Sequence, residues 1–92
     1  MPKLSEEAIE SRLRSLEGWR RQGDAITKTF TFSSFPEAIS FVHRVADTAE
    51  ASDHHPDIDI RYRRVTLSYW THTEGGVTEK DFEGARAADR CA

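Results

Sequence analysis

The chain begins with the hydrophobic pattern of a helix. Ile9, Leu13 and Leu16 recur at positions i, i+4 and i+7, which lie on one face of a helix. Ser5 precedes two glutamates, and this order is typical of an N-cap followed by an acidic first turn. Gly18 follows the last hydrophobic position and fits a C-terminal stop. The pattern predicts a first helix from Ser5 to just before Gly18.

From Trp19 the hydrophobic period changes to that of β-strands. Gly23 and Asp24 are a turn signal between a short strand around residues 19–22 and a longer strand. In the longer strand, hydrophobic residues and threonines alternate, so they are expected on opposite faces of a sheet. The hydrophobic face holds Ile26, Phe30 and Phe32, and the polar face holds Thr27, Thr29 and Thr31. This pattern predicts a β-hairpin.

A second helix is expected from Ser34 to just before His54. Ser34 and Glu37 have the spacing of a capping box, and Pro56 disfavours helical geometry in the residue before it. The hydrophobic stripe is broad, with Phe41 well off its centre, and such a helix is usually covered on more than one side. We therefore expect a second subunit against it. The stripe consists of Phe35, Ala38, Ile39, Val42, Val45, Ala46 and Ala49.

The last part of the chain predicts a second hairpin and a third helix. Hydrophobic residues alternate over residues 58–62 and again over 65–69, with a tight turn at Arg63-Arg64 between them. Thr78 and Asp81 resemble the capping box of a helix. The element order αββαββα predicts an α+β, two-layer fold, with a four-stranded antiparallel sheet and helices packed on one face.

Length and composition restrict the function further. The chain has 92 residues, no linker and no repeat, so we expect a single domain over residues 1–92. The net charge is −3 and the basic residues are scattered, which argues against nucleic acid or an anionic membrane as the main partner. The N-terminal residues lack the apolar stretch of a secretory signal, and we expect a cytoplasmic protein.

The candidate chemistry lies in three histidines at the ends of predicted elements. His54 and His55 follow the second helix, and His72 follows the last strand. Glu50 lies one helical turn before His54, where its carboxylate is placed to accept one imidazole N–H and orient the other nitrogen. Histidine titrates near neutral pH, so this arrangement favours general acid–base catalysis.

Two other interpretations of the histidines remain open from the residues alone. The pair before the proline is also compatible with an ordinary polar helix end, and His43 within the helix is expected to be a surface residue. A zinc site would need a fourth ligand, which Glu50 or Asp57 could supply. Adjacent histidines in an extended segment point to opposite faces, and the usual ligand spacing is absent, so no metal site is expected.

Four short motifs together resemble the pterin-4a-carbinolamine dehydratase family. They are Glu50-Ala51-Ser52-Asp53-His54-His55-Pro56, Tyr62-Arg63-Arg64-Val65, Thr71-His72, and Gly75-Gly76-Val77-Thr78 with Asp81. The family pattern has E-x-x-x-H-H-P, Y-x-x-V, T-H and G-L-T-x-x-D at the same spacings. The resemblance covers most of the chain and is most specific over residues 50–81.

The resemblance implies an α+β fold in which two protomers extend their sheets, and dimers pair through the second helix into tetramers. It also implies elimination of water from a 4a-hydroxytetrahydropterin, without a metal or an organic cofactor. His54 and His72 are then the candidates for acid and base, and His55 for gripping the pterin. Glu50 would orient His54, while Asp81 would organise the His72 loop or cap its helix.

The residues around the motifs set the expected substrate contacts. Pro56 and Thr71 belong to the motifs themselves, whereas two positions depart from the family. Ile58 stands where many members have an aromatic residue expected near the pterin, and Trp70 replaces a smaller residue. Two other functions stay open: a protein-binding regulatory module, as in members that act as transcriptional coactivators, and a related role in molybdopterin metabolism.

Overall fold

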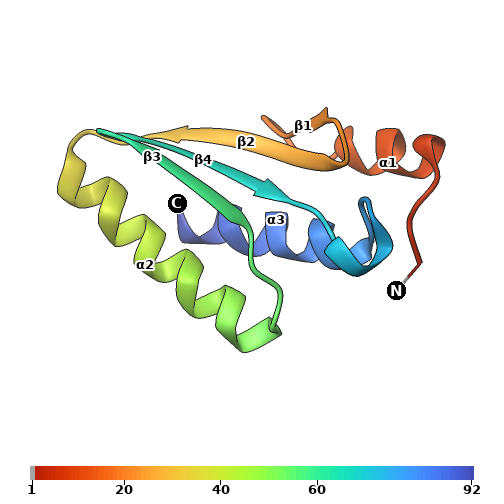
Figure 1. Cartoon of the computed structure of the whole chain (residues 1–92). Coiled ribbons are helices and arrows are strands. Elements are labelled where there is room, and N and C mark those ends of the chain that lie inside the picture. The colour runs from red at the N-terminus through yellow and green to blue at the C-terminus, as the bar shows by residue number, and fades with distance from the viewer. Residues whose placement is uncertain (1) are drawn as a thin grey trace.

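The computed structural model describes residues 2–92, and its centre is a four-stranded antiparallel sheet (Figure 1). The strands are β1 (Arg20–Gln22), β2 (Ala25–Thr31), β3 (Asp57–Arg61) and β4 (Arg64–Tyr69). They lie in the order β1-β2-β4-β3, so the two hairpins join through β2 and β4. The predicted α+β fold is confirmed, and β3 is left as an edge strand.

Helices α2 (Phe35–Ser52) and α3 (Glu79–Cys91) cover one face of the sheet, and α1 (Glu6–Leu13) lies at its end, near the turn between β1 and β2 (Figure 1). The predicted N-caps form at Ser5 and Ser34, but the capping box expected between Ser34 and Glu37 is only half made, because the Glu37 carboxylate accepts from the Ser33 hydroxyl. The side chain of Ser5 accepts from the Ala8 N–H, and that of Ser34 accepts from the Glu37 N–H. These bonds satisfy amide groups that have no partner within their helix.

The core lies between the sheet and the two covering helices. Strand alternation sends Ile26, Val65 and Leu67 toward the helices, where they pack against Phe41 and Phe82. All five are fully buried. The opposite face of the sheet carries hydroxyl side chains that bond across the strands, as Thr29 does with Thr66 at 2.8 Å. The core therefore holds α2 and α3 at fixed positions under the sheet, and their ends carry the candidate site.

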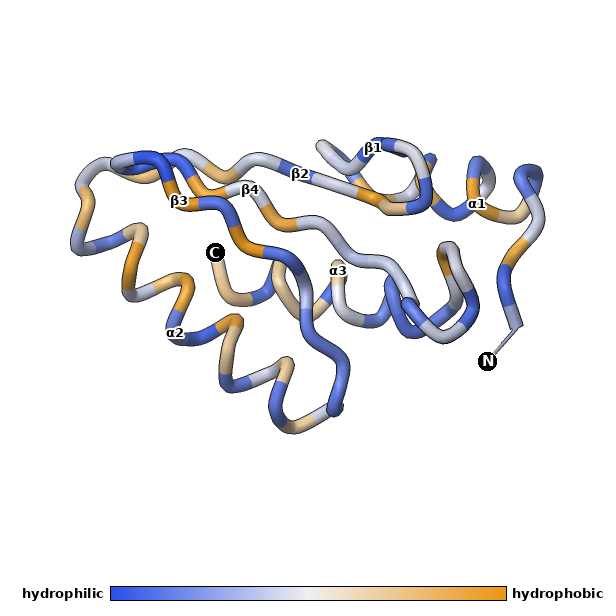
Figure 2. Tube along the Cα trace, in the orientation of Figure 1, coloured by the Kyte–Doolittle hydropathy of each residue, from blue (hydrophilic) through white to orange (hydrophobic). Residues whose placement is uncertain are grey.

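Two details of the predicted helices differ from the structure. Helix α1 ends at Leu13, and Leu16 reaches the core from the turns that follow, so the first helix is shorter than expected. On α2 the buried face is centred on Phe41, which is fully buried, whereas Phe35 and Ile39 are exposed. The expected centre of the stripe was wrong because the sheet selects one side of a helix that is hydrophobic on two sides (Figure 2).

No helix within residues 2–92 has the length and hydrophobicity needed to cross a membrane.

Candidate active site

His54 follows the end of α2 and lies beside the start of α3. Asp53 caps the helix in the left-handed conformation with φ 53°, which aspartate tolerates better than most residues. The following His54 N–H closes the end by bonding to the Ala49 carbonyl at 3.1 Å. This turn directs the His54 side chain toward the start of α3, and only 13% of that side chain stays exposed.

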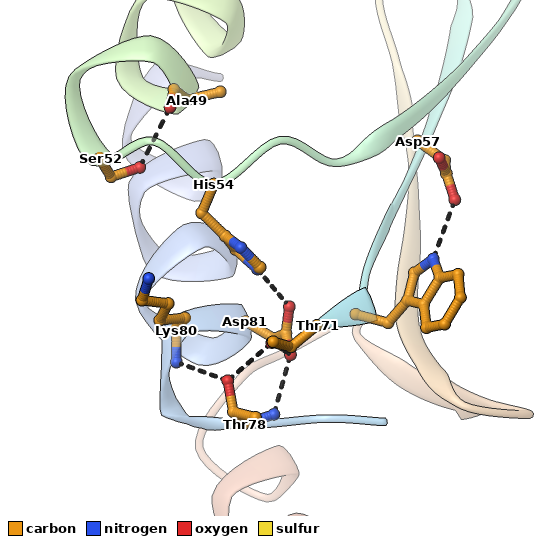
Figure 3. A network of polar contacts seen from close by, with 9 residues as sticks. Ala49, Ser52, His54, Asp57, Thr71, Thr78, Lys80 and Asp81 are labelled. Atoms are coloured by element: carbon orange, nitrogen blue, oxygen red, sulfur yellow. Dashed lines mark hydrogen bonds and ion pairs between the residues drawn. The ribbon is translucent and has the colours of Figure 1, made fainter. Parts of the chain in front are cut away.

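Asp81 is the partner of His54. Its Oδ1 lies 2.6 Å from Nε2 of His54, and its side chain is fully buried (Figure 3). The other oxygen, Oδ2, accepts from the Thr71 hydroxyl at 2.9 Å and from the Thr78 backbone N–H at 2.8 Å. The second of these bonds belongs to the predicted capping box of α3. One carboxylate therefore caps α3, holds the end of β4 and contacts the imidazole.

The donors around Asp81 fix the direction of each hydrogen bond. The Lys80 N–H donates to the Thr78 hydroxyl, which lies 2.8 Å from the Thr71 hydroxyl. Since the Thr71 hydroxyl donates to Asp81, the Thr78 hydroxyl must donate to Thr71. An ionised Asp81 only accepts, so Nε2 of His54 carries a hydrogen. This leaves Nδ1 of His54 to exchange a proton when the ring is neutral.

His55 and Glu50 form a separate, exposed pair. Nε2 of His55 lies 2.6 Å from Oε1 of Glu50, with 54% and 78% of the two side chains exposed. The expected pairing of Glu50 with His54 is therefore wrong. That expectation assumed that the helix continues to His54, whereas the left-handed Asp53 ends it and turns His54 away from the side that Glu50 occupies.

His72 lies on the other side of the site, in a short 3-10 turn over His72–Glu74. Its ring contacts the indole of Trp70, with ring centroids 3.9 Å apart and planes tilted by 40°. The Trp70 Nε1 in turn donates to Oδ2 of Asp57 at 3.3 Å (Figure 3). Trp70 thus faces the site.

A cavity of about 300 Å³ brings the three predicted histidines together. Its wall also contains Trp70 and Thr71. The remaining lining residues were not predicted from the sequence, and they are Asp53, Thr73 and Lys80. Lys80 gave no separate signal because a lysine near a helix start is ordinary, whereas Asp53 and Thr73 adjoin the histidine motifs and could have been found there.

Four of the predicted site residues do not line this cavity. Asp81 and Glu50 lie outside the lining, and each bonds to one histidine of the cavity, Asp81 to His54 and Glu50 to His55. Pro56 is half-buried, and Ile58 lies on the edge strand β3 with 38% of its surface exposed. The aromatic surface of the cavity is therefore provided by Trp70 at the end of β4, and the side chain at position 58 does not take part. Within residues 2–92, no three histidine, cysteine, aspartate or glutamate side chains lie close enough together to hold one metal ion.

Tyr69 supports His54 from the core side. Its ring lies nearly parallel to the imidazole, with centroids 6.3 Å apart and an interplanar angle of 25°. Burial raises the pKa of the Tyr69 phenol far above its ordinary value, and the nearby Cys91, Asp81 and Asp89 raise it further. The phenol is therefore neutral at physiological pH and acts as a flat, uncharged surface beneath His54.

The family is decided by the match over the whole chain. The family model described as "Pterin 4 alpha carbinolamine dehydratase" matches residues 2–91. The chain belongs to this family. Membership supports a dehydratase, which is a lyase.

Relatives in sequence and structure agree with the family. A protein of Roseiflexus sp. (strain RS-1), named "Putative pterin-4-alpha-carbinolamine dehydratase", is 59% identical over 87 residues, which cover 95% of this chain and 94% of that one. The crystal structure of a transcriptional coactivator/pterin dehydratase from Brucella melitensis is 39% identical, covers 98% of both chains and has a TM-score of 0.95.

A more distant member of the fold shows that it also serves other roles. A solved pterin dehydratase-like protein, identified as a RuBisCO assembly factor in the alpha-carboxysome, is 25% identical with a TM-score of 0.71. The match covers 83% of this chain and 90% of that one. Membership in the fold does not by itself determine the activity, which depends on the side chains of the cavity.

Proposed function

We propose that this chain is a cytoplasmic 4a-hydroxytetrahydropterin dehydratase that uses the histidines of the cavity as acid and base. The observation that carries the proposal is the convergence of His54, His55 and His72 on one cavity of about 300 Å³. That volume is at the lower end of the range for small-molecule sites and suits a two-ring heterocycle. The product is the quinonoid dihydropterin. Its reduction then regenerates the tetrahydropterin that a hydroxylation reaction had oxidised.

The reaction needs two proton transfers. Hydroxide is a poor leaving group, so an acid must protonate the 4a-oxygen while the C–O bond breaks and water leaves. The electron pair that replaces the bond comes from the ring nitrogens, and a base removes the proton of a ring N–H. The proton given to the oxygen and the proton taken from nitrogen balance, and no oxidant or reductant is consumed. Each positioned acid or base contributes about 10²–10⁴-fold to such a step.

His54 is the residue best placed to transfer a proton in a fixed direction. Its Nε2 is held by the buried carboxylate of Asp81 at 2.6 Å, which leaves Nδ1 as the exchanging nitrogen. A carboxylate behind an imidazole also stabilises the imidazolium that forms when the ring accepts a proton. We therefore assign the base to His54 and the acid to His72, and we assign pterin binding to the more exposed His55.

The activity is tested by following the dehydration of a 4a-hydroxytetrahydropterin spectrophotometrically with and without the protein. The matched control is His43→Ala, because His43 is an exposed histidine on α2 with 79% of its side chain accessible and no part in the cavity. We expect the wild type and this control to accelerate the reaction equally. A wild-type rate equal to the uncatalysed rate would overturn the proposal.

The exposed hydrophobic residues support a homodimer or homotetramer as the working form. Edge strand β3 presents Ile58 and Ile60 at 38% and 40% exposure, and α2 presents Phe35 and Ile39 at 46% and 39%. An unpaired strand edge with hydrophobic side chains is a template for pairing with another chain. Figure 2 shows these hydrophobic stretches on β3 and along α2. We propose association through the sheet edge and through α2.

Sedimentation velocity of the wild type and of Ile60→Lys tests the assembly. We expect the wild type to sediment as a dimer or larger species and the variant to shift toward the monomer, because a lysine at the pairing edge opposes association. Thr29→Lys, on the polar face of the sheet, is the control and should leave the assembly unchanged. A wild-type monomer at high concentration contradicts association through either surface.

A further inference from the structure

His72 differs from the other two histidines of the cavity in how it is held. His54 and His55 each bond to a carboxylate oxygen at 2.6 Å. Within residues 2–92, the His72 side chain makes no such bond, and its one close partner is the indole of Trp70, with centroids 3.9 Å apart. An imidazole in an exposed 3-10 turn is free to rotate unless a neighbour restrains it, so the indole is the restraint on this ring.

Trp70 is itself fixed by the register of the sheet. Asp57 on β3 pairs with Ser68 on β4, and Trp70 follows Ser68 by two positions. A residue displaced by two positions on the neighbouring strand lies diagonally across the same face, within reach of a long aromatic side chain. The bond from Trp70 Nε1 to Asp57 Oδ2, at 3.3 Å, uses this diagonal and defines the tilt of the indole.

We propose that Trp70 is the positioning residue for His72, with its indole bonded to Asp57 and in contact with the imidazole. The proposal rests on the proposed dehydratase function, since it assigns Trp70 to one of the two proton-transferring groups of that reaction. The indole restrains the orientation of the His72 ring, as the Asp81 carboxylate restrains that of His54. It restrains the ring by contact with an aromatic surface, without forming a salt bridge.

The other charged groups of the cavity do not replace this contact. Asp53 and Lys80 line the same cavity as His72, together with His54 and His55. Glu74 belongs to the same short turn as His72, and Asp57 lies behind the indole. None of these groups forms an ion pair with His72 among the described residues. Removal of the indole therefore leaves the imidazole without a fixed orientation, while the pairs of His54 and His55 persist.

The experiment compares wild type, Trp70→Leu and Trp70→Phe by NMR of the histidine ring protons in the absence of substrate, with His72→Ala to identify the signals. An indole in contact with the imidazole displaces the His72 ring-proton signals by its ring current. We expect Trp70→Leu to move these signals toward those of the exposed His43, with the His54 signals unchanged. Trp70→Phe should retain part of the displacement. Tyr62→Asn removes an exposed aromatic ring elsewhere and should change nothing.

The dehydration assay gives the second readout. We expect kcat to fall by about 10- to 100-fold in Trp70→Leu, the loss typical of a misplaced catalytic group, and to recover partly in Trp70→Phe. His72 signals that are identical in wild type and Trp70→Leu would overturn the proposal. A Trp70→Leu protein whose His72 signals move while its kcat stays at the wild-type value would overturn it as well. Absence of wild-type dehydration would overturn the proposed function separately, because the NMR comparison still determines whether Trp70 orients His72.

Discussion

Asp81 and His54 are separated by 27 residues in sequence and joined by a hydrogen bond of 2.6 Å between Oδ1 and Nε2. Asp81 lies in the first turn of α3, and His54 follows the end of α2. Their bond therefore connects the ends of two helices that cover the same face of the sheet. Because the carboxylate is fully buried and also accepts from Thr71 and Thr78, it has little freedom to move away from the imidazole.

The first prediction concerns the replacement Asp81→Asn. The amide preserves the shape of the side chain and one acceptor oxygen for Thr71 and Thr78. Its NH₂ group must then face Nε2 of His54, which makes Nε2 an acceptor and reverses the tautomer of a neutral ring. We expect kcat to fall by roughly 100-fold or more, because His54 presents a hydrogen where the reaction needs a base. Steady-state kinetics with urea unfolding separates this loss from loss of folded protein.

The matched control is Glu50→Gln, the same chemical change on the other histidine pair. This pair is exposed, and solvent screens it, so we expect the free energy of unfolding to change by less than about 0.5 kcal/mol. We expect kcat to change by only a few-fold. Equal losses of kcat in the two variants would show that the buried carboxylate has no special role.

The second prediction concerns Gly84 on α3, which allows the helix to approach Tyr69 closely. A Cβ at this position would lie 2.5 Å from Cε1 and 2.8 Å from Cδ1 of the buried Tyr69 ring. Alanine gains about 1 kcal/mol over glycine in a helix interior. Overpacking of a core costs about 1–3 kcal/mol. Since Tyr69 is enclosed by Trp19 and His54, we expect the clash to exceed the gain.

Urea unfolding of Gly84→Ala tests this balance. We expect the variant to be less stable than the wild type, and Glu83→Ala, at the exposed neighbouring position, to remain within about 0.5 kcal/mol of it. A Gly84→Ala protein that is more stable than the wild type would contradict the close packing of α3 on Tyr69.

The third prediction is a loss of stability in alkali caused by Tyr69. Burial raises the pKa of this phenol, so above pH 10 the unfolded chain releases the proton while the folded chain retains it. The folded state then binds more protons than the unfolded state. The free energy of unfolding therefore falls as pH rises, by about 1.4 kcal/mol per pH unit for one group.

Tyr69→Phe removes the ionisable hydroxyl and keeps the ring. We expect this variant to match the wild type closely in urea unfolding at pH 8 and to lose stability less steeply above pH 10. Parallel pH profiles for the two proteins would contradict the assignment of the alkaline loss to Tyr69.

The fold was predictable because its local signals agree with one another. The N-caps at Ser5, Ser34 and Thr78 form where the sequence predicted them. Both hairpins also form, although the second turns at Tyr62-Arg63, one residue before the predicted Arg63-Arg64. The centre of the buried face of α2 was not predictable in the same way. Phe35 and Phe41 lie on different sides of a helix that is hydrophobic on both, and only the position of the sheet selects Phe41.

The candidate site was predictable in its residues and less so in its pairings. The motifs identified His54, His55 and His72, which do line one cavity. The partner of His54 depends on a single left-handed residue, Asp53, whose conformation follows from the end of α2 and leaves no clear pattern in the sequence. The contact between Trp70 and His72 likewise depends on where β4 ends and the 3-10 turn begins.

The central claim is that histidines of this cavity transfer the protons of the dehydration. The most direct test is the rate of quinonoid dihydropterin formation by wild type, His54→Ala and His72→Ala, each verified as folded. We expect a wild-type rate well above the uncatalysed rate and a loss of about 100-fold or more in each variant. Two folded variants that dehydrate the pterin at the wild-type rate would contradict it.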